Sequence, residues 1–137
     1  GIENIAYLTL FYESDLIAHF NCSWSSPVKL RNVLVGGDKK MILYNDLEAT
    51  EKVKIYDTGF EVKEMSKQNL RVDYRVGDVY IPKLEPKEAL SGVISDFVDS
   101  STNSVEPLSN FKLGLEVVEV LEAAQKSIKN NGTMVEI

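Results

Sequence analysis

The chain has 137 residues and a formal net charge of −6, with 44% hydrophobic and 26% charged residues. These values fit one globular domain, residues 1–137, and exclude a disordered chain. The acidic balance and the lack of a clustered basic surface argue against nucleic acid as a partner. No apolar run approaches the roughly 20 residues of a membrane helix. We therefore expect a cytoplasmic protein with no membrane partner.

The sequence contains one cysteine, Cys22, and one histidine, His19. A lone cysteine forms no intramolecular disulfide, which favours a reducing compartment. One cysteine and one histidine also cannot make a closed zinc site, so no metal is expected. The chain begins with Gly1 rather than Met, which favours a processed or excised chain.

The first half of the sequence predicts antiparallel strands. Residues 5–12 and 16–25 flank a short polar turn, as in a hairpin. Period-two alternation in the second run places Cys22 and Trp24 on an apolar core face and His19 on the opposite, more polar face. Further strands are predicted at 29–35, 41–46, 52–56, 60–65, 69–76 and 79–81, joined by turns at 36–38, 57–59 and 77–78.

The second half predicts two helices and a last strand. Apolar residues from 90 to 98 recur at helical spacing, and Pro86 suits a first helical position. A second helix is expected over 110–130, capped by Ser109 and ended by Asn131-Gly132. Residues 134–137 look like a short final strand. The predicted fold class is α+β, with an open-faced, mainly antiparallel sheet and two helices packed on one face.

No catalytic motif stands out in the sequence. The eight glycines form neither GxGxxG nor a phosphate-binding loop. With one histidine, no nucleophile can be matched to a base and an acid. We therefore assign no catalytic residue and no cofactor-binding residue to this chain.

Five residues are candidates for substrate binding or for an interface. His19 lies on the polar strand face, Lys29 and Arg31 could meet an anionic substrate, and Tyr74 and Arg75 flank a glycine turn. For each of them, a surface, interface or turn residue is the competing interpretation, because exposed polar side chains usually face water. Cys22 and Trp24 are interpreted as core residues.

Residues 16–31, with the segment Ser23-Trp24 and Pro27-x-Lys29-x-Arg31, resemble a segment of the Gfo/Idh/MocA oxidoreductase family. The resemblance continues through the glycine turn and strand at 36–46, through Tyr-Arg-x-Gly-Asp at 74–78 with Glu-Pro at 85–86, and through the helix at 114–127. It covers nearly the whole chain.

The resemblance implies the C-terminal domain of a two-domain enzyme that acts on a sugar, an inositol or a nucleotide sugar. The missing N-terminal Rossmann domain would hold NAD or NADP, and this chain would bind no cofactor itself. The family's catalytic motifs precede the position where this chain begins, so none is carried onto it. The resemblance also implies a homo-oligomer formed through the open sheet face.

Two function classes follow. The first is an oxidoreductase C-terminal domain that is inactive alone and contributes to substrate binding and oligomerisation. The alternative is a stand-alone module, either binding a small ligand in an apolar pocket with a few polar groups or serving oligomerisation only. Tight NADH binding by the isolated chain would contradict the first class.

Overall fold

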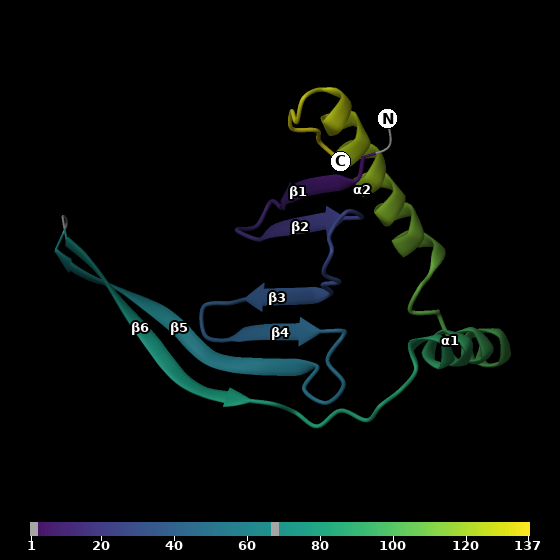
Figure 1. Cartoon of the computed structure of the whole chain (residues 1–137), viewed down its shortest axis with the longest axis horizontal. Helices are drawn as coiled ribbons and strands as arrows, with labels where there is room; N and C mark the ends of the chain where they lie inside the picture. Colours follow the sequence, from purple (N-terminus) through teal and green to yellow (C-terminus); the bar gives the residue numbers. More distant parts are fainter. Residues whose placement is uncertain (1–2, 67–68) are drawn as a thin grey trace. The chain divides into compact units, whose positions relative to one another are not determined.

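A computed structural model of the chain describes residues 3–66 and 69–137, with side chains outside residues 61–72. In this part of the chain, six strands precede two helices (Figure 1). The strands are β1 (Ile5–Phe11), β2 (Ile17–Ser23), β3 (Asn32–Gly36), β4 (Met41–Asn45), β5 (Val53–Ser66) and β6 (Asn69–Tyr80). The helices are α1 (Ala89–Asn103) and α2 (Phe111–Lys129). The chain divides into two compact units, residues 1–25 with 87–137, and residues 26–86.

In the first unit, β1 and β2 form the predicted antiparallel hairpin, with Leu8 opposite Phe20 and Thr9 opposite His19. The predicted core face of β2 is only partly confirmed. Ala18 is half-buried, but Phe20 is exposed, Cys22 is exposed, and Trp24 beyond the strand is 90% exposed. The interpretation of Cys22 and Trp24 as core residues is therefore wrong in this structure, because no layer within the unit covers them.

The ends of the two helices are set by different local features. α1 begins at Ala89 with no side-chain cap, so the prediction of Pro86 at the first helical position is wrong, and it ends where Ser104 takes the left-handed conformation at φ 53°. The Asn110 side chain caps α2 by accepting a hydrogen bond from the Leu113 N–H at 2.9 Å, so Ser109 is not the cap.

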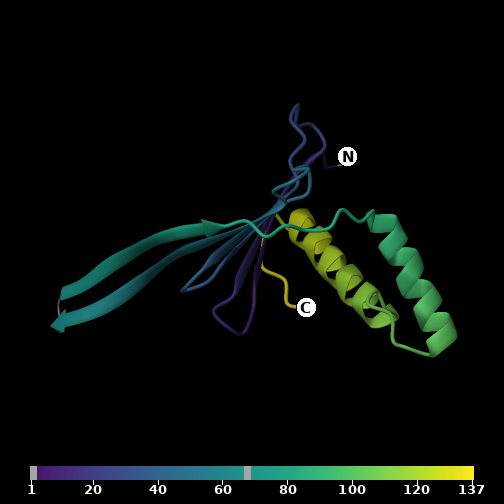
Figure 2. The same cartoon turned by 90° about the horizontal axis from the view of Figure 1, so that it is seen from below.

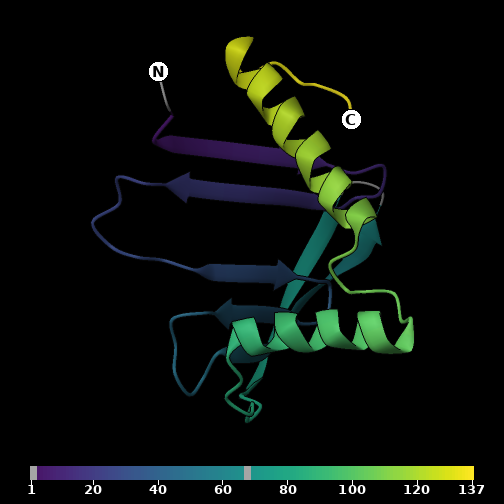
Figure 3. The ribbon, with the colours of Figure 1, turned by 90° about the vertical axis from the view of Figure 1, so that its right-hand side faces the viewer.

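The C-terminal tail folds back beside α2 rather than forming a strand (Figure 3). Ser127 donates a hydrogen bond to the Thr133 carbonyl at 2.7 Å, and Gly132 adopts φ 81°, as helix stops often do. Glu136 and Ile137 lie against the last turns of the helix beside Ala123. The prediction of a final strand at 134–137 is wrong.

The second unit is an antiparallel sheet in the order β3-β4-β5-β6. The predicted hairpin turn after Gly36 is confirmed, since Gly37 N–H bonds to the Lys40 carbonyl at 3.0 Å. The turns predicted at 57–59 and 77–78 are wrong, because β5 and β6 run straight through them with a bulge after Tyr56. The connection at 67–68 lies outside the described residues.

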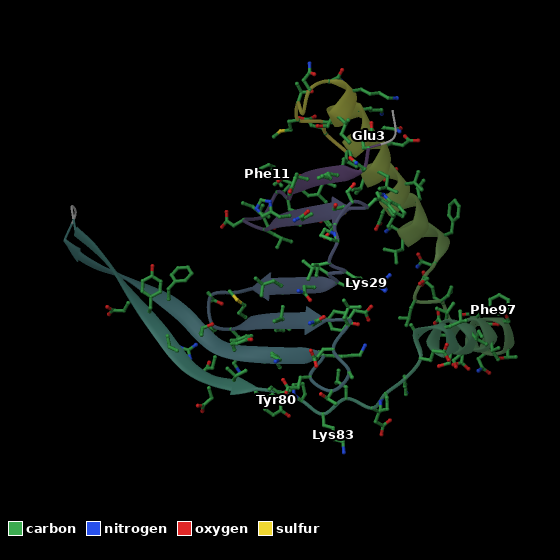
Figure 4. All side chains as sticks on the ribbon, in the orientation of Figure 1. Glu3, Phe11, Lys29, Tyr80, Lys83 and Phe97 are labelled. Atoms are coloured by element: carbon green, nitrogen blue, oxygen red, sulfur yellow. The ribbon has the colours of Figure 1, made fainter. Side chains whose placement is uncertain are left out.

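The α+β class with an open, mainly antiparallel arrangement of strands is confirmed, although the strands form sheets of two and four rather than one sheet. That the two helices pack on one sheet face stays a prediction, as does a single domain over 1–137. Among the described residues only Ala123 is buried, at 8% exposure, and Phe97 on α1 is 70% exposed (Figure 4). No described helix combines the length and apolar character needed to cross a bilayer.

Candidate functional site

Arg31 lies at one end of the second unit, in an ionic cluster around Asp46. β3 and β4 pair with Asn32 opposite Asn45, which places Arg31 and Asp46 side by side just beyond the strands. The Asp46 N–H donates to the Arg31 carbonyl at 3.0 Å, and Arg31 Nη1 lies 3.3 Å from Asp46 Oδ2. The Tyr44 hydroxyl donates to Asp46 Oδ1 at 3.0 Å. These bonds fix the start of the connection to β5.

Lys52 closes the same connection from its far end. Its Nζ donates to the Asp46 carbonyl at 3.0 Å and lies 3.6 Å from Asp46 Oδ1. The pKa of Asp46 is held below its usual value, first by the Tyr44 hydroxyl, then by Arg31, and also by Lys52. A carboxylate held ionised in this way is a poor general acid near neutral pH. Arg31 and Lys52 share the single carboxylate of Asp46, so the Arg31 guanidinium is already engaged within the sheet.

Arg75 lies on β6 and forms a second cluster that joins three segments of the unit. Its Nη1 lies 2.6 Å from Asp57 Oδ2 on β5, and its Nη2 donates to the Lys39 carbonyl in the β3–β4 turn at 2.6 Å. Arg75 also donates to the Asp57 carbonyl at 3.4 Å. We call Arg75, Asp57 and Lys39 the clamp, because they tie the β3–β4 turn to the base of the β5–β6 hairpin.

Two glycines make the clamp possible. A Cβ atom on Gly59 would lie 2.5 Å from the Asp38 carbonyl oxygen, and one on Gly77 would lie 2.7 Å from Asp57 Oδ2. Side chains at either position would push the three segments apart. The pKa of Asp57 is lowered mainly by its hydrogen bond to Arg75. The clamp is therefore a structural site in which the Arg75 guanidinium is bound by the Asp57 carboxylate and by the Lys39 carbonyl.

His19 belongs to the first unit, where it pairs across the hairpin with Thr9. The Thr9 hydroxyl lies 3.0 Å from His19 Nδ1, and the direction of that hydrogen bond depends on the tautomer. Both residues are exposed. This bond sets the ring orientation and leaves Nε2 as the position from which the imidazole could meet a ligand.

Lys29 and Tyr74 are the candidates least committed to other contacts. Lys29 lies on the exposed segment before β3, and no ion pair of Lys29 is found in the part of the chain that the structure describes (Figure 4). Tyr74 stands opposite Phe60 on the β5–β6 hairpin and is 81% exposed. Both side chains can contact a partner without first breaking a bond.

The four candidates of the second unit do not converge on one point. Arg31 and Arg75 mark opposite ends of the β3–β4 hairpin, whose five-residue strands span roughly 17 Å at about 3.4 Å per residue. Each arginine is instead matched to an aspartate that the sequence did not single out. Asp46 directly follows a strand that ends in Tyr44-Asn45. Its place at the end of that strand was the one feature of the sequence that could have indicated its role in the cluster. Asp57 carried no such signal, because its partner is 18 residues away.

A cavity of about 360 Å³ opens between α1 and the loop that leads to α2. Its lining includes Val93, Phe97 and Pro107, with Asp96 and Ser100 as polar members. The Asp96 carboxylate is occupied, because both of its oxygens accept the Leu108 N–H at 3.2 and 3.1 Å. None of the five sequence candidates lines this cavity.

Within residues 3–66 and 69–137, no group of three or more His, Cys, Asp or Glu side chains is placed to hold a metal ion. The site geometry therefore consists of two ionic clusters, around Asp46 and at the clamp, one histidine–threonine pair and two uncommitted side chains. Comparisons with family models, with curated proteins and with solved structures found no match to this chain.

Proposed function

We propose that this chain is the C-terminal domain of an NAD(P)-dependent oxidoreductase acting on a sugar, an inositol or a nucleotide sugar. In this proposal the chain contributes to substrate binding and to oligomerisation, and it is inactive without a Rossmann domain that holds the cofactor. The resemblance of residues 16–31, 36–46, 74–78, 84–86 and 114–127 to the Gfo/Idh/MocA family supports the assignment.

The structural observation that supports the proposal most is the uncovered sheet of the second unit. Residues 26–86 contain four strands and no helix among the residues described, so neither face of this sheet is covered within its unit. Leu34 and Val35 are neighbours on β3 and point to opposite faces, yet they are 62% and 55% exposed. An apolar sheet face is stable only when another layer covers it. A sheet-to-sheet oligomer would supply that layer on one face.

The candidate residues divide by what they can offer a substrate. Arg31 and Arg75 are engaged by Asp46 and Asp57, which suits support of the sheet rather than capture of an anion. Lys29 and Tyr74 can each donate a hydrogen bond to a hydroxyl or phosphate group. His19 could do the same through Nε2. The NAD(P) cofactor that exchanges a hydride with the substrate, and the catalytic acid–base group, would come from the Rossmann domain of the proposed parent enzyme.

The test is to express this chain together with the coding sequence that precedes it, and the chain alone, and to titrate both with NADH by fluorescence. The longer protein is expected to bind NADH and, when NAD+ or NADP+ is supplied as hydride acceptor, to oxidise a member of a panel of sugars, inositols and nucleotide sugars. The chain alone is expected to do neither. Tight NADH binding by the isolated chain, or a preceding sequence without a nucleotide-binding domain, would overturn the proposal.

A further inference from the structure

The β5–β6 hairpin continues well past the rest of its sheet (Figure 2). β4 pairs with β5 only from Val53 to Tyr56, whereas β5 and β6 continue to pair as far as Ser66 and Asn69. We call this two-stranded extension, residues 58–66 and 69–76, the arm. A two-stranded ribbon is marginal on its own in water, and its outer edge offers unpaired N–H and C=O groups to a further strand. The arm therefore lacks a third strand.

The direction of the arm is fixed at its base before any partner arrives. The clamp of Arg75, Asp57 and Lys39 holds the first residues of the arm against the β3–β4 turn. The bulge after Tyr56 adds local twist at the same point. An arm fixed in this way loses little further freedom when it docks, which favours association.

One face of the arm near its base is apolar and exposed. Phe60 stands opposite Tyr74, and Thr58 stands opposite Val76, which places all four on one face. Tyr74 and Val76 are 81% and 84% exposed, and Phe60 is 54% exposed. These side chains are far more exposed than apolar residues on a paired and covered hairpin.

We propose that the outer edge of β6 pairs antiparallel with β6 of a second copy of this chain, about a two-fold axis at Tyr74. A two-fold axis that relates neighbouring antiparallel strands is perpendicular to the sheet. It passes midway between the two copies of one residue, which therefore stand opposite each other. This register places Tyr74 opposite its own copy and Asp73 opposite Arg75 of the second copy, twice by symmetry. It also places Val72 of the second copy opposite the exposed Val76.

Charge separates this register from its neighbours. A shift of the axis to Arg75 would place two arginines opposite each other, and a shift to Asp73 would place Arg71 opposite Arg75; both cost stability. An axis at Val72 also pairs opposite charges, but it places no apolar residue of the second copy opposite Val76. Arg75 can serve a second carboxylate, because a guanidinium has five N–H donors. The inference goes beyond the proposed function, since edge pairing needs neither a cofactor domain nor a covered sheet face.

The test uses disulfide trapping in the whole chain with Cys22→Ser as the background. In the proposed register Tyr74→Cys lies opposite itself, within the 4.4–6.8 Å Cα separation that a disulfide spans. Val76→Cys is the matched control, because its two copies would lie roughly 13 Å apart along the antiparallel strands. We expect Tyr74→Cys to double in mass on a non-reducing gel and Val76→Cys to stay single.

Two further measurements keep the outcome decisive. Sedimentation of the unmodified chain is expected to show a concentration-dependent dimer, and Tyr74→Lys, which puts like charges on the axis, is expected to abolish it while circular dichroism stays unchanged. Trapping through Val72→Cys but not Tyr74→Cys would overturn the register. A strict monomer with no trapping, or a dimer that Tyr74→Lys leaves intact, would overturn the edge pairing itself. None of these readouts involves NADH, so this inference and the proposed function can fail separately.

Discussion

Helix α2 and the β5–β6 hairpin differ in the sequence separation of the hydrogen bonds that fix each of them. α2 is closed at its start by Asn110 bonding three residues ahead, and at its end by Gly132 and Ser127 bonding within a few residues. The hairpin is fixed at its base by Arg75, whose partners are 18 and 36 residues away. Glycine therefore plays different roles in the two regions. A helical glycine has room for a side chain, whereas the glycines next to the clamp do not.

The largest expected effect tests that contrast directly. Gly59→Ala should destabilise the chain by about 2 kcal/mol, the usual cost of forcing extra atoms into a filled space, because the new Cβ would meet the Asp38 carbonyl. Gly92→Ala in α1 has nothing within 4 Å of its Cβ position and should stabilise by roughly 0.5–1 kcal/mol. Urea unfolding of both variants measures the difference. Equal effects of the same sign would remove the contrast.

Loss of the α2 cap should have the next largest effect. Asn110→Ala removes the side chain that accepts the Leu113 N–H and should cost about 1 kcal/mol. Ser109→Ala is the matched control and should change little, since the Ser109 side chain is not the cap. Thermal unfolding followed by circular dichroism at 222 nm reports on the helices. A larger loss of stability in Ser109→Ala than in Asn110→Ala would show that Ser109, not Asn110, caps the helix.

Substitution of the two arginines should sharpen the comparison between local and long-range bonds. Arg75→Met removes the side-chain bond to Lys39, and the amide of Gly37 in the same turn should then exchange its hydrogen faster. Arg31→Met should leave that amide unchanged, because Arg31 lies at the other end of the hairpin and Asp46 still bonds its carbonyl. Hydrogen exchange by NMR distinguishes the two variants. Equal acceleration in both would mean that the clamp does not hold the turn.

The smallest expected effect is in the acid dependence of stability. Arg75 lowers the pKa of Asp57 in the folded chain, so the pair contributes fully above the ordinary carboxyl pKa of about 3.9 and is lost as pH falls through the lowered value. Asp57→Asn should therefore flatten the fall in stability between about pH 5 and pH 2. Asp15→Asn, which removes an exposed carboxylate of the β1–β2 turn, should leave the slope closer to wild type. An unchanged slope in Asp57→Asn would show that the pair contributes nothing.

The elements that could be predicted from the sequence are those whose causes lie within a few residues. The first hairpin, the β3–β4 turn and the core of both helices follow from alternation, turn residues and helical spacing. Gly59 and Gly77 were misread as turn residues because each follows or precedes an aspartate, as turn glycines often do. Their actual role is to let distant backbone pass close by, and no local pattern encodes which segment will pass.

The candidate site shows the same limit. Arg75 and Arg31 were singled out as candidates for substrate binding or for an interface, which stays a prediction, whereas the aspartates that they contact, Asp57 and Asp46, were not singled out. Pairing of these charges depends on strand register, which is set by the whole sheet and not by the residues around each arginine. The interpretation of Trp24 as a core residue is wrong for a related reason. Alternation assigns a side chain to a face of the sheet but does not show whether another layer covers that face.

The division of the chain into an inserted unit and a unit built from both ends has a consequence for synthesis on the ribosome. Residues 26–86 are contiguous and consist of antiparallel neighbours, so this sheet can form while later residues are still being added. The other unit cannot be completed until residues after 87 emerge. The β1–β2 hairpin is therefore synthesised more than 60 residues before the helices of its own unit. During that interval no other element of its unit is available to pack against the β1–β2 hairpin.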